Sequence, residues 1–382
     1  MAESLGPKPL LPTNEIPADP GGPKPKPGMA LCLSGGGYRA MLFHVGALWR
    51  LNELAFLPQL QRVSSVSGGS ITAALLAMKW ERLKFVDGVA TEFVHEVVRP
   101  IRALARRTID IPAAIGGIFG PRPAAHYIAA FYRKHLFGRK TLQDLPDKPA
   151  PLFVINATNL QSGVLWRFTK PFIWDYRVGK IPRPAIEVAT AVAASSAFPP
   201  PLSPLVLNFN ETDFERDTGK DLQRPPFTTK VYLTDGGVYD NLGLEAAKDY
   251  ETIIVSDGGA RMVAYRKPQK NWLGLSRRVL DVIDNQVGAL RRRHLIEAYR
   301  AGQTKGTYWG IGSQMASYGT PSTLPFNQAD ADRAAGVPTR LKALDESTQK
   351  LLINWGYWIC DAAVRKHVRL GAPPPVKLPF AE

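Results

Sequence analysis

The stretch MALCLSGGGYRAMLFHVGALWRLNEL, residues 29–54, constrains the fold more than any other part of the chain. MALCLS predicts a buried strand, because it is a short apolar run that ends in turn-forming residues. Apolar residues then recur between Phe43 and Leu54 at spacings of four, four and three, the period of one helix face. Three glycines, Gly35–Gly37, separate the two elements. A strand, a tight glycine turn and a helix in this order predict an α/β protein.

Further strands are predicted in PLFVINATNL, KVYLTDGG and ETIIVSDGG, each of which is bounded by turn formers. Their alternation with helical patterns predicts a central, mainly parallel sheet flanked by helices. The chain shows no internal repeat with a period of roughly 20 to 50 residues, which argues against a solenoid or a propeller.

The predicted domain organisation is a leader followed by one large domain. Residues 1–28 are rich in proline, glycine and lysine and lack the apolar core of a secretory signal, so we expect an extended, disordered leader. Residues 29–382 are expected to form one catalytic domain, with a less certain helical part over about 261–382. The longest apolar stretches are shorter than the roughly 18 residues that span a membrane, so any membrane contact is expected to be peripheral.

The two cysteines, Cys32 and Cys360, stand in apolar contexts and match no C-x-x-C spacing. They predict buried thiols in a reducing compartment, and therefore a cytoplasmic protein. The sequence offers no cluster of metal ligands, and we expect neither a metal ion nor a cofactor.

The charge balance suggests an anionic partner. The chain has 48 Lys and Arg against 33 Asp and Glu, a net charge of +15, which favours phospholipid headgroups or nucleic acid. No zinc-finger spacing or aromatic RNA-binding motif is present, so we expect a membrane surface and no nucleic acid. Residues 98–123 combine basic and apolar character and are a candidate lid or membrane contact; the alternative is a segment that packs on the core.

Ser67 is the candidate nucleophile. It stands in SVSGGS, between a β-branched run and a helical pattern formed by Ile71, Leu75 and Met78. A serine on such a strand-to-helix turn is the arrangement of a nucleophile elbow, where small neighbours are needed because the backbone is strained. The alternative is a serine that only caps the helix.

The glycines Gly35, Gly36 and Gly37 suggest a second part of the same site. Residues without Cβ let consecutive backbone N–H groups converge on an anion, as the oxyanion hole of an acyl-transfer enzyme requires. The same spacing, with Ala40, also fits a dinucleotide-binding fingerprint. That alternative needs an acidic residue about 20 residues further on, at the end of the next strand, and the sequence offers none there.

Asp235, at the end of the strand KVYL and followed by two glycines, is the candidate general base. A second Asp-Gly-Gly makes Asp257 a competing candidate. His294 and His367 follow Asp235 in the chain order of an ordinary triad, but their basic contexts predict exposed helix surfaces. His44, within the first helix, is expected to satisfy a local polar contact.

The motifs SGGGYRA, SVSGGS and DGGVYDNLG, in this order, resemble those of the patatin-like phospholipases and of the related cytosolic phospholipase A2 catalytic domains. The sequences SGGGxRA and SGGS are closer to the cytosolic phospholipase variant. The segment ASSAFPPPL resembles one that these proteins carry between the nucleophilic serine and the aspartate. The resemblance covers residues 29–260. It implies a patatin-like three-layer architecture and a serine–aspartate dyad that needs no histidine, no metal and no cofactor.

The resemblance also implies roles for the remaining site residues. The amides of Gly36, Gly37 and Gly68, in the loop that Gly35 begins, would hold the oxyanion. Arg39 matches an arginine that either faces the substrate phosphate or braces the loop. Asp235 is preferred to Asp257 because only Asp235 is followed by VYDNLG. One departure is Ser65, which stands where the elbow pattern has glycine.

The expected function is therefore a lipid acyl-ester hydrolase of the phospholipase A or lysophospholipase type, acting on phospholipid or another lipid ester at a membrane surface. An acyltransferase would share the acyl-enzyme and differ only in the acceptor. A non-catalytic lipid-binding protein on the same fold is the other alternative.

Overall fold

The structure is a computed structural model that describes residues 25–120, 123–259, 262, 264–267, 269–319 and 324–380. Within these residues the chain forms a 10-stranded sheet and a separate two-stranded one. The strands are β1 (Lys26–Leu33), β2 (Leu60–Val66), β3 (Phe85–Val86), β4 (Val89–Ala90), β5 (Leu152–Asn159), β6 (Leu165–Phe168), β7 (Phe172–Asp175), β8 (Gly179–Pro182), β9 (Leu205–Asn208), β10 (Lys230–Asp235), β11 (Tyr250–Asp257) and β12 (Lys305–Gly310).

The large sheet has a parallel half and an antiparallel half. Strands β12, β11, β1, β2 and β5 lie side by side in that order and are parallel. Strands β6, β7 and β8 extend the sheet from β5 in antiparallel steps, and β10 pairs antiparallel with β5 and β9. The predicted α/β class with a central parallel sheet is confirmed. The antiparallel half follows from its short connections, since parallel neighbours need a long crossover.

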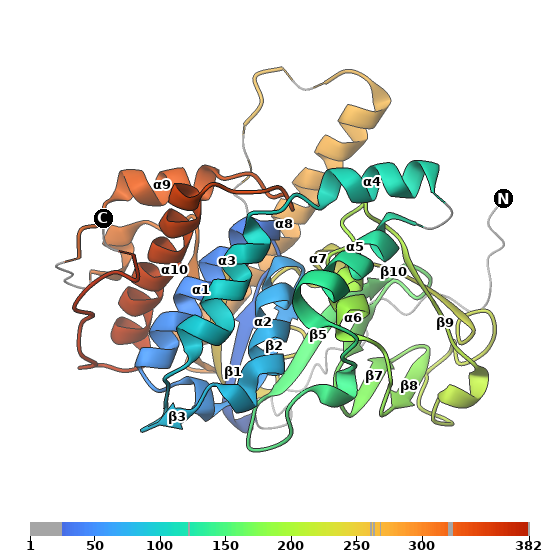
Figure 1. The fold of residues 1–382 in the computed structure, drawn as a ribbon, viewed down its shortest axis with the longest axis horizontal. Coiled ribbons are helices and arrows are strands. Elements are labelled where there is room, and N and C mark those ends of the chain that lie inside the picture. The colour runs from blue at the N-terminus through green and yellow to red at the C-terminus, as the bar shows by residue number, and fades with distance from the viewer. Residues whose placement is uncertain are drawn as a thin grey trace.

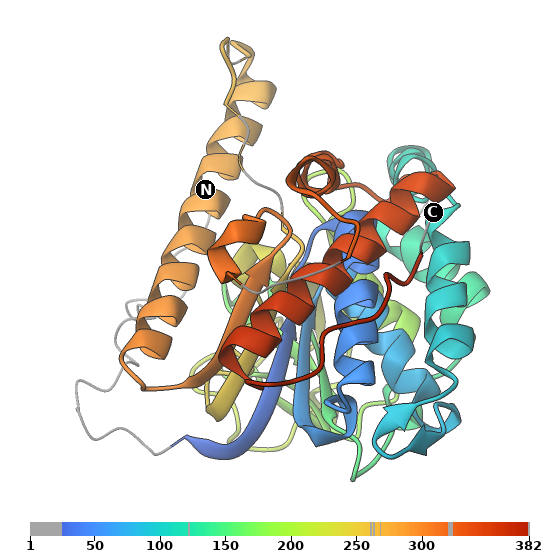
Figure 2. The same ribbon diagram turned by 90° about the vertical axis from the view of Figure 1, so that its left-hand side faces the viewer.

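Helices cover both faces of this sheet (Figures 1 and 2). They are α1 (Gly37–Glu53), α2 (Gly68–Lys79), α3 (Arg99–Ala105), α4 (Asp110–Phe119), α5 (Ala124–Tyr132), α6 (Val188–Ser195), α7 (Gly237–Asp240), α8 (Trp272–Arg300), α9 (Gln328–Gly336) and α10 (Glu346–His367). In Figure 2, α8 stands on one side of the sheet, and α1, α2 and α10 stand on the other. The result is the three-layer arrangement that the sequence predicts.

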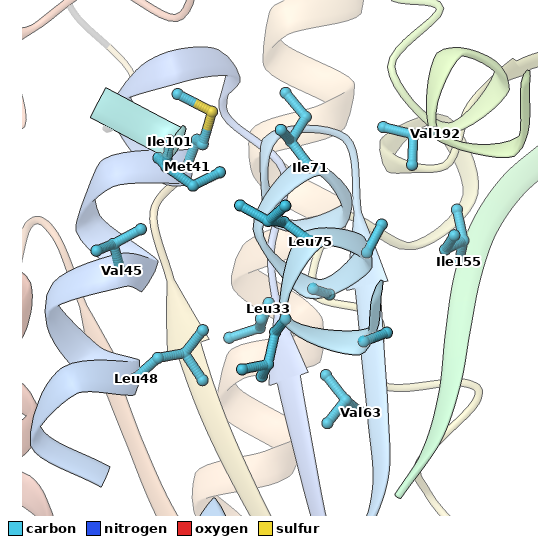
Figure 3. Close-up of a cluster of buried hydrophobic side chains, with 14 of the residues drawn as sticks. Leu33, Met41, Val45, Leu48, Val63, Ile71, Leu75, Ile101, Ile155 and Val192 are labelled. Carbon is cyan, nitrogen blue, oxygen red and sulfur yellow. The ribbon is translucent and has the colours of Figure 1, made fainter. Parts of the chain in front are cut away.

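The main core lies between the sheet and the layer that contains α1 and α2 (Figure 3). Leu33 of β1 and Val63 of β2 are completely buried beneath Ile71 and Leu75 of α2. Strand β1 is apolar on both faces, with Leu31 and Leu33 in the main core and Ala30 and Cys32 in a second cluster, as expected where helices cover a parallel sheet on both sides. This packing fixes the ends of β1 and β2, where the glycine turns begin.

Helix α10 is part of this core, although its packing against α1 was not predicted from the sequence. It packs along α1, and glycines permit the close approach of the two backbones. A Cβ added at Gly46 would lie 1.9 Å from the carbonyl oxygen of Ile353, and one at Gly356 would lie 1.9 Å from that of Phe43. The chain beyond residue 260 therefore stabilises the helix that follows the first glycine turn.

Further expectations concern the leader, residues 98–123 and the two cysteines. Of the predicted leader, residues 1–24 lie outside the described residues, while Lys26 already belongs to β1. Residues 98–123 form α3, α4 and their connections, apart from residues 121 and 122, which lie outside the described residues. Cys32 and Cys360 are free and buried, as predicted. No helix among the described residues has the length and apolarity to cross a membrane.

Candidate active site

Ser67 lies between the end of β2 and the first turn of α2. Its backbone has φ 50° and ψ −118°, a strained conformation for a residue with a Cβ. Such strain, roughly 1 to 3 kcal/mol, persists only where the surrounding packing imposes it. The geometry is that of a strand-to-helix elbow, and it presents the serine side chain at the end of the parallel strands.

Asp235 reaches Ser67 because two strands of opposite direction end at the same point along β5. Val66 of β2 pairs with Asn156, and Asp235 of β10 pairs with the next residue, Ala157. The parallel strand and the antiparallel strand thus converge, which places Ser67, directly after β2, close to Asp235, the last residue of β10. The Ser67 side chain lies close enough to the Asp235 carboxylate to lower the pKa of that group.

Asp235 is buried, with 3% of its surface exposed. Burial raises its pKa to about 7, because the charged form loses its hydration. A hydrogen bond from the Gly237 N–H, 2.7 Å from Oδ1, and the nearby Ser67 side chain act against this rise, while the negative charge of Asp284 on α8 adds to it. A carboxyl group with a pKa near neutrality can accept a proton and return it, which is what a general base and acid must do.

A network of serines holds the elbow from below. The Ser67 N–H donates to the Ser195 hydroxyl at 2.8 Å, and Ser70 and Ser195 share a hydrogen bond of 2.9 Å. Ser70 in turn donates to Ser65 at 3.1 Å. Ser65, the departure from the usual glycine, is therefore part of the support of the elbow. Ser195 belongs to the segment ASSAFPPPL, whose resemblance was noted without a role for any single residue.

The glycine loop packs directly against this elbow. Gly36 and Gly37 have φ values of 143° and 60°, which favour glycine. A Cβ added to Gly35 would lie 3.2 Å from the Ser67 Cβ and 2.4 Å from the Asn241 side chain. A Cβ added to Gly68 would lie 2.1 Å from the Gly37 carbonyl oxygen. The two predicted motifs are thus one packed unit, as the resemblance implies.

The backbone amides around Ser67 fall into two groups. Gly35 donates its N–H to the carbonyl oxygen of Asn241 at 3.1 Å, so this N–H is not free to bind an oxyanion. The missing side chain of Gly35 leaves room for Ser67. No hydrogen bond joins the N–H groups of Gly36, Gly37 or Gly68 to another described residue. Gly37 and Gly68 open α1 and α2, where the first N–H groups have no partner within the helix.

Arg39 and His44 brace the glycine loop from within α1. Arg39 is buried, and its guanidinium donates to the carbonyl oxygens of Gly258 (2.9 and 3.1 Å) and Val337 (2.8 Å). His44 Nε2 lies 2.9 Å from the Ser34 carbonyl oxygen, and Nδ1 lies 2.8 Å from the Ser256 hydroxyl. Burial lowers the pKa of His44 to about 4, so the ring is neutral. Both side chains tie the loop to the end of β11.

Asp257, the competing candidate base, has different neighbours. Its Oδ2 lies 3.2 Å from Arg292 Nη1 and accepts a hydrogen bond from Tyr308 at 2.7 Å. His294 on α8 and His367 at the end of α10 are exposed. Within the described part of the chain, none of the three has a hydrogen bond to Ser67 or Asp235. The described residues also contain no group of three or more metal-ligating side chains.

The fold and the site define a class: an α/β protein in which an elbow serine, a buried aspartate and a glycine loop meet at the ends of the strands. The family model described as patatin-like phospholipase matches residues 31–248. The chain belongs to the patatin-like phospholipase family, a family of lipid hydrolases.

No curated protein matches the chain. Among solved structures, human GIVD cytosolic phospholipase A2 is similar, with a TM-score of 0.49 and 12% identity over 87% of this chain and 60% of that one. VipD from Legionella pneumophila has a TM-score of 0.32 and 15% identity over 86% of this chain and 67% of that one. The chain thus spans 60% of the length of the human structure.

Proposed function

We propose that this protein is a phospholipid acyl hydrolase in which Ser67 and Asp235 form a catalytic dyad. Ser67 Oγ attacks the ester carbonyl while the Asp235 carboxylate takes its proton and passes it to the departing alcohol. Water then attacks the acyl-enzyme with Asp235 again as the base. The observation that carries the proposal is the convergence of β2 and β10 on β5, which brings the elbow serine next to a buried aspartate whose pKa is about 7.

The negative charge of the tetrahedral intermediate is received by backbone N–H groups. We assign this role to Gly36, Gly37 and Gly68, whose N–H groups are without a described partner beside Ser67. Arg39 is assigned a positioning role, since its guanidinium already donates to the backbone carbonyls that fix the glycine loop. This favours the loop-bracing alternative over contact with a substrate phosphate.

The lipid surface is contacted by α8 in this proposal. The N-terminal part of this helix projects beyond the rest of the fold (Figures 1 and 2). Its exposed apolar side chains are Trp272, Leu275, Val279, Leu280, Val282, Ile283, Val287 and Leu290. Trp272 is 79% exposed and opens the helix next to the exposed basic residues Arg266, Lys267 and Lys270. An apolar helix face with a tryptophan and basic flanks suits the boundary of an anionic membrane.

Residues 98–123 are a weaker candidate for this contact. Ile101 and Leu104 of α3, Ile109 and Ala113 are all buried in the core. Leu344 donates its N–H to the carbonyl oxygen of Ala105 at 2.8 Å, which ties α3 to the body of the protein. The apolar side chains described in this segment serve packing, in contrast to those of α8.

The dyad is tested by fatty-acid release from phosphatidylcholine vesicles and from vesicles that also contain phosphatidylglycerol. We expect Ser67→Ala to lose at least about 1000-fold in kcat, while His294→Ala and His367→Ala keep most of the activity. A comparable loss in either histidine variant would contradict the dyad. Adding a lysophospholipid acceptor distinguishes hydrolysis from acyl transfer, since transfer would yield diacyl product in place of free fatty acid.

The role of α8 is tested by vesicle co-sedimentation. Leu280→Ser and Ile283→Ser should weaken binding to anionic vesicles, because each removes exposed apolar area. Leu370→Ser is the matched control, since Leu370 is 83% exposed and lies outside α8. Vesicle binding that is unchanged in both α8 variants would contradict a role of α8 in membrane contact.

A further inference from the structure

A cavity of about 190 Å³ opens on the sheet face that lies opposite α2. It is lined by side chains of β2, β5, β6 and β7 and by the segment 246–249. Its floor includes Arg62 of β2, the neighbour of Val63. Val63 points into the core beneath α2 (Figure 3), so Arg62 points to the other face, because successive residues of a strand alternate.

The strand register gathers the polar lining of this cavity from separate strands. Arg62 pairs with Leu152 of β5, and Arg167 of β6 pairs with Asn156 of β5 and with Trp174 of β7. Leu152 and Asn156 are four residues apart in one strand, and paired residues share a face. Two arginines and an aromatic ring are thereby placed on one surface by the sheet itself.

Both guanidinium groups are held by aromatic rings. The Arg62 guanidinium carbon lies 5.0 Å from the centre of the Tyr250 ring, and that of Arg167 lies 5.1 Å from the centre of the Trp174 ring. Arg62 also donates from Nη1 to the carbonyl oxygen of Ala246 at 2.5 Å. Stacking of this kind fixes the plane of each group and leaves its N–H edge available.

The two arginines lack a carboxylate partner. Arg62 Nε is buried and has no hydrogen-bond partner, and the Arg167 guanidinium has no hydrogen bond or ion pair with any residue that the structure describes. Asp249, the acidic side chain of the lining, is 3.3 Å from Lys26 and is balanced by it. Both arginines are partly buried, and a guanidinium group that is withdrawn from water without a partner is costly.

The electrostatics agree with this geometry. Burial lowers the pKa of Arg167, and the positive charge of Arg62 lowers it further, while the carboxylates of Glu245 and Asp249 act in the opposite direction. The two cations are therefore close enough to repel each other. An anion between them would remove both the repulsion and the desolvation cost.

We propose that this cavity binds a phosphate group that carries two negative charges, held between the guanidinium groups of Arg62 and Arg167. Planar guanidinium groups bind phosphate oxygens through paired N–H donors, and a phosphate monoester matches the two uncompensated charges. The ring of Phe172, which also lines the cavity, offers an apolar wall to a group attached to the phosphate. The ligand is either a soluble phosphate monoester or the headgroup of a lipid such as phosphatidic acid.

This site is separate from the proposed active site. Arg62 precedes Ser67 by five residues, a distance of about 16 Å along an extended strand. That distance exceeds the few bonds between the phosphate of a glycerophospholipid and its ester carbonyls. No lining residue of the cavity belongs to the proposed dyad or to the glycine loop, so the proposal does not depend on the chemistry of Ser67.

The experiment is calorimetric titration of the full chain with inorganic phosphate and with glycerol phosphate. We expect both to bind the wild type, and Arg167→Gln to weaken binding at least tenfold. Arg167→Lys should be intermediate, because it keeps the charge and loses the paired donors. Arg224→Gln, at an exposed arginine outside the cavity, should bind as the wild type does, and so should Ser67→Ala.

Vesicles distinguish the two sources of the phosphate group. If phosphatidic acid in phosphatidylcholine vesicles increases binding of the wild type but not of Arg167→Gln, the ligand is a lipid headgroup. Binding of the soluble phosphates alone indicates a metabolite. Absence of binding by both kinds of probe, or equal binding by wild type and Arg167→Gln, overturns the proposal. Thermal unfolding shows that the variants are folded, and phosphate should raise the unfolding temperature of the wild type more than that of Arg167→Gln.

Discussion

Two turns of this protein have the same local sequence and different surroundings. Asp235 and Asp257 each end a strand and precede two glycines, and each accepts the N–H of the second glycine, at 2.7 Å from Gly237 and 2.8 Å from Gly259. Beyond the turn they differ. Asp257 meets Arg292 and Tyr308, whereas Asp235 meets the Ser67 hydroxyl in a site without a cation beside it.

The difference shows how one motif serves two purposes. The Asp-Gly-Gly sequence determines the turn, because aspartate accepts a nearby backbone N–H and glycine relieves crowding. The partners across the fold determine the chemistry. A carboxylate paired with arginine holds a structure together, while a buried carboxylate without a cation is ready to exchange a proton.

The largest expected effect separates the two aspartates by activity. Asp235→Asn removes the group that accepts the serine proton, and we expect ester hydrolysis to fall by about 1000-fold or more. Asp257→Asn leaves the dyad intact and should cost at most about tenfold. Initial rates with a soluble short-chain ester measure both without interference from membrane binding. Equal losses would mean that Asp257 acts in the reaction.

The two substitutions should change the free energy of unfolding in opposite directions. The pKa of Asp235 is about 7 in the folded protein, above its unfolded value of 3.8, so its contribution to stability is complete below about pH 4 and is lost as the pH rises through 7. At pH 8, Asp235→Asn should therefore stabilise the protein by roughly 2 to 4 kcal/mol. Asp257→Asn should destabilise it by about 1 to 2 kcal/mol, because Arg292 loses its partner.

Denaturant unfolding at pH 8 and pH 5 measures this contrast. The advantage of Asp235→Asn over the wild type should shrink at pH 5, where the wild-type carboxyl is already protonated. An advantage that is the same at both pH values would show that burial of the charge is not its cause.

The pH dependence of activity tests which group accepts the serine proton. Only ionised Asp235 can accept the serine proton, so kcat/KM should rise with pH and level off above about 7. Because an ordinary histidine would give a similar curve, the profile must be repeated with His294→Ala and His367→Ala. We expect the same midpoint in both variants, and a lost or shifted limb in either one would assign the titration to that histidine.

Much of this site is predictable from local sequence. The two strand–turn–helix motifs predict the elbow at Ser67 and the glycine loop, because the backbone conformations that such turns need are encoded by glycines next to them. The strand before Asp235 is also predictable. Its antiparallel direction is not, and yet that direction brings Asp235 to Ser67 along the edge of β5.

Other features depend on residues that are distant in sequence. The ion pair between Arg292 and Asp257 and the hydrogen bond from the Ser67 N–H to Ser195 join residues at least 35 positions apart. No local pattern contains them. The apolar face of α8 was not predicted, although Leu275, Val279, Ile283 and Val287 recur every four residues. Whether such a face is buried or exposed depends on the neighbours that the fold provides.

The smallest expected effect links the two aspartates through α8. The charge of Asp284 raises the pKa of Asp235, and Asp284 also interacts with Asp257. Asp284→Asn should therefore lower the midpoint of the activity profile by a few tenths of a pH unit, because the Asp235 carboxylate no longer faces a second negative charge. Asp281→Asn is the matched control and should leave the midpoint unchanged, because the charge of Asp281 acts on Asp284 and is not among the charges that act on Asp235. The shift should diminish at high ionic strength, where such interactions are screened. An identical midpoint in wild type and Asp284→Asn at low salt would mean that the charge of Asp284 does not contribute to the pKa of Asp235.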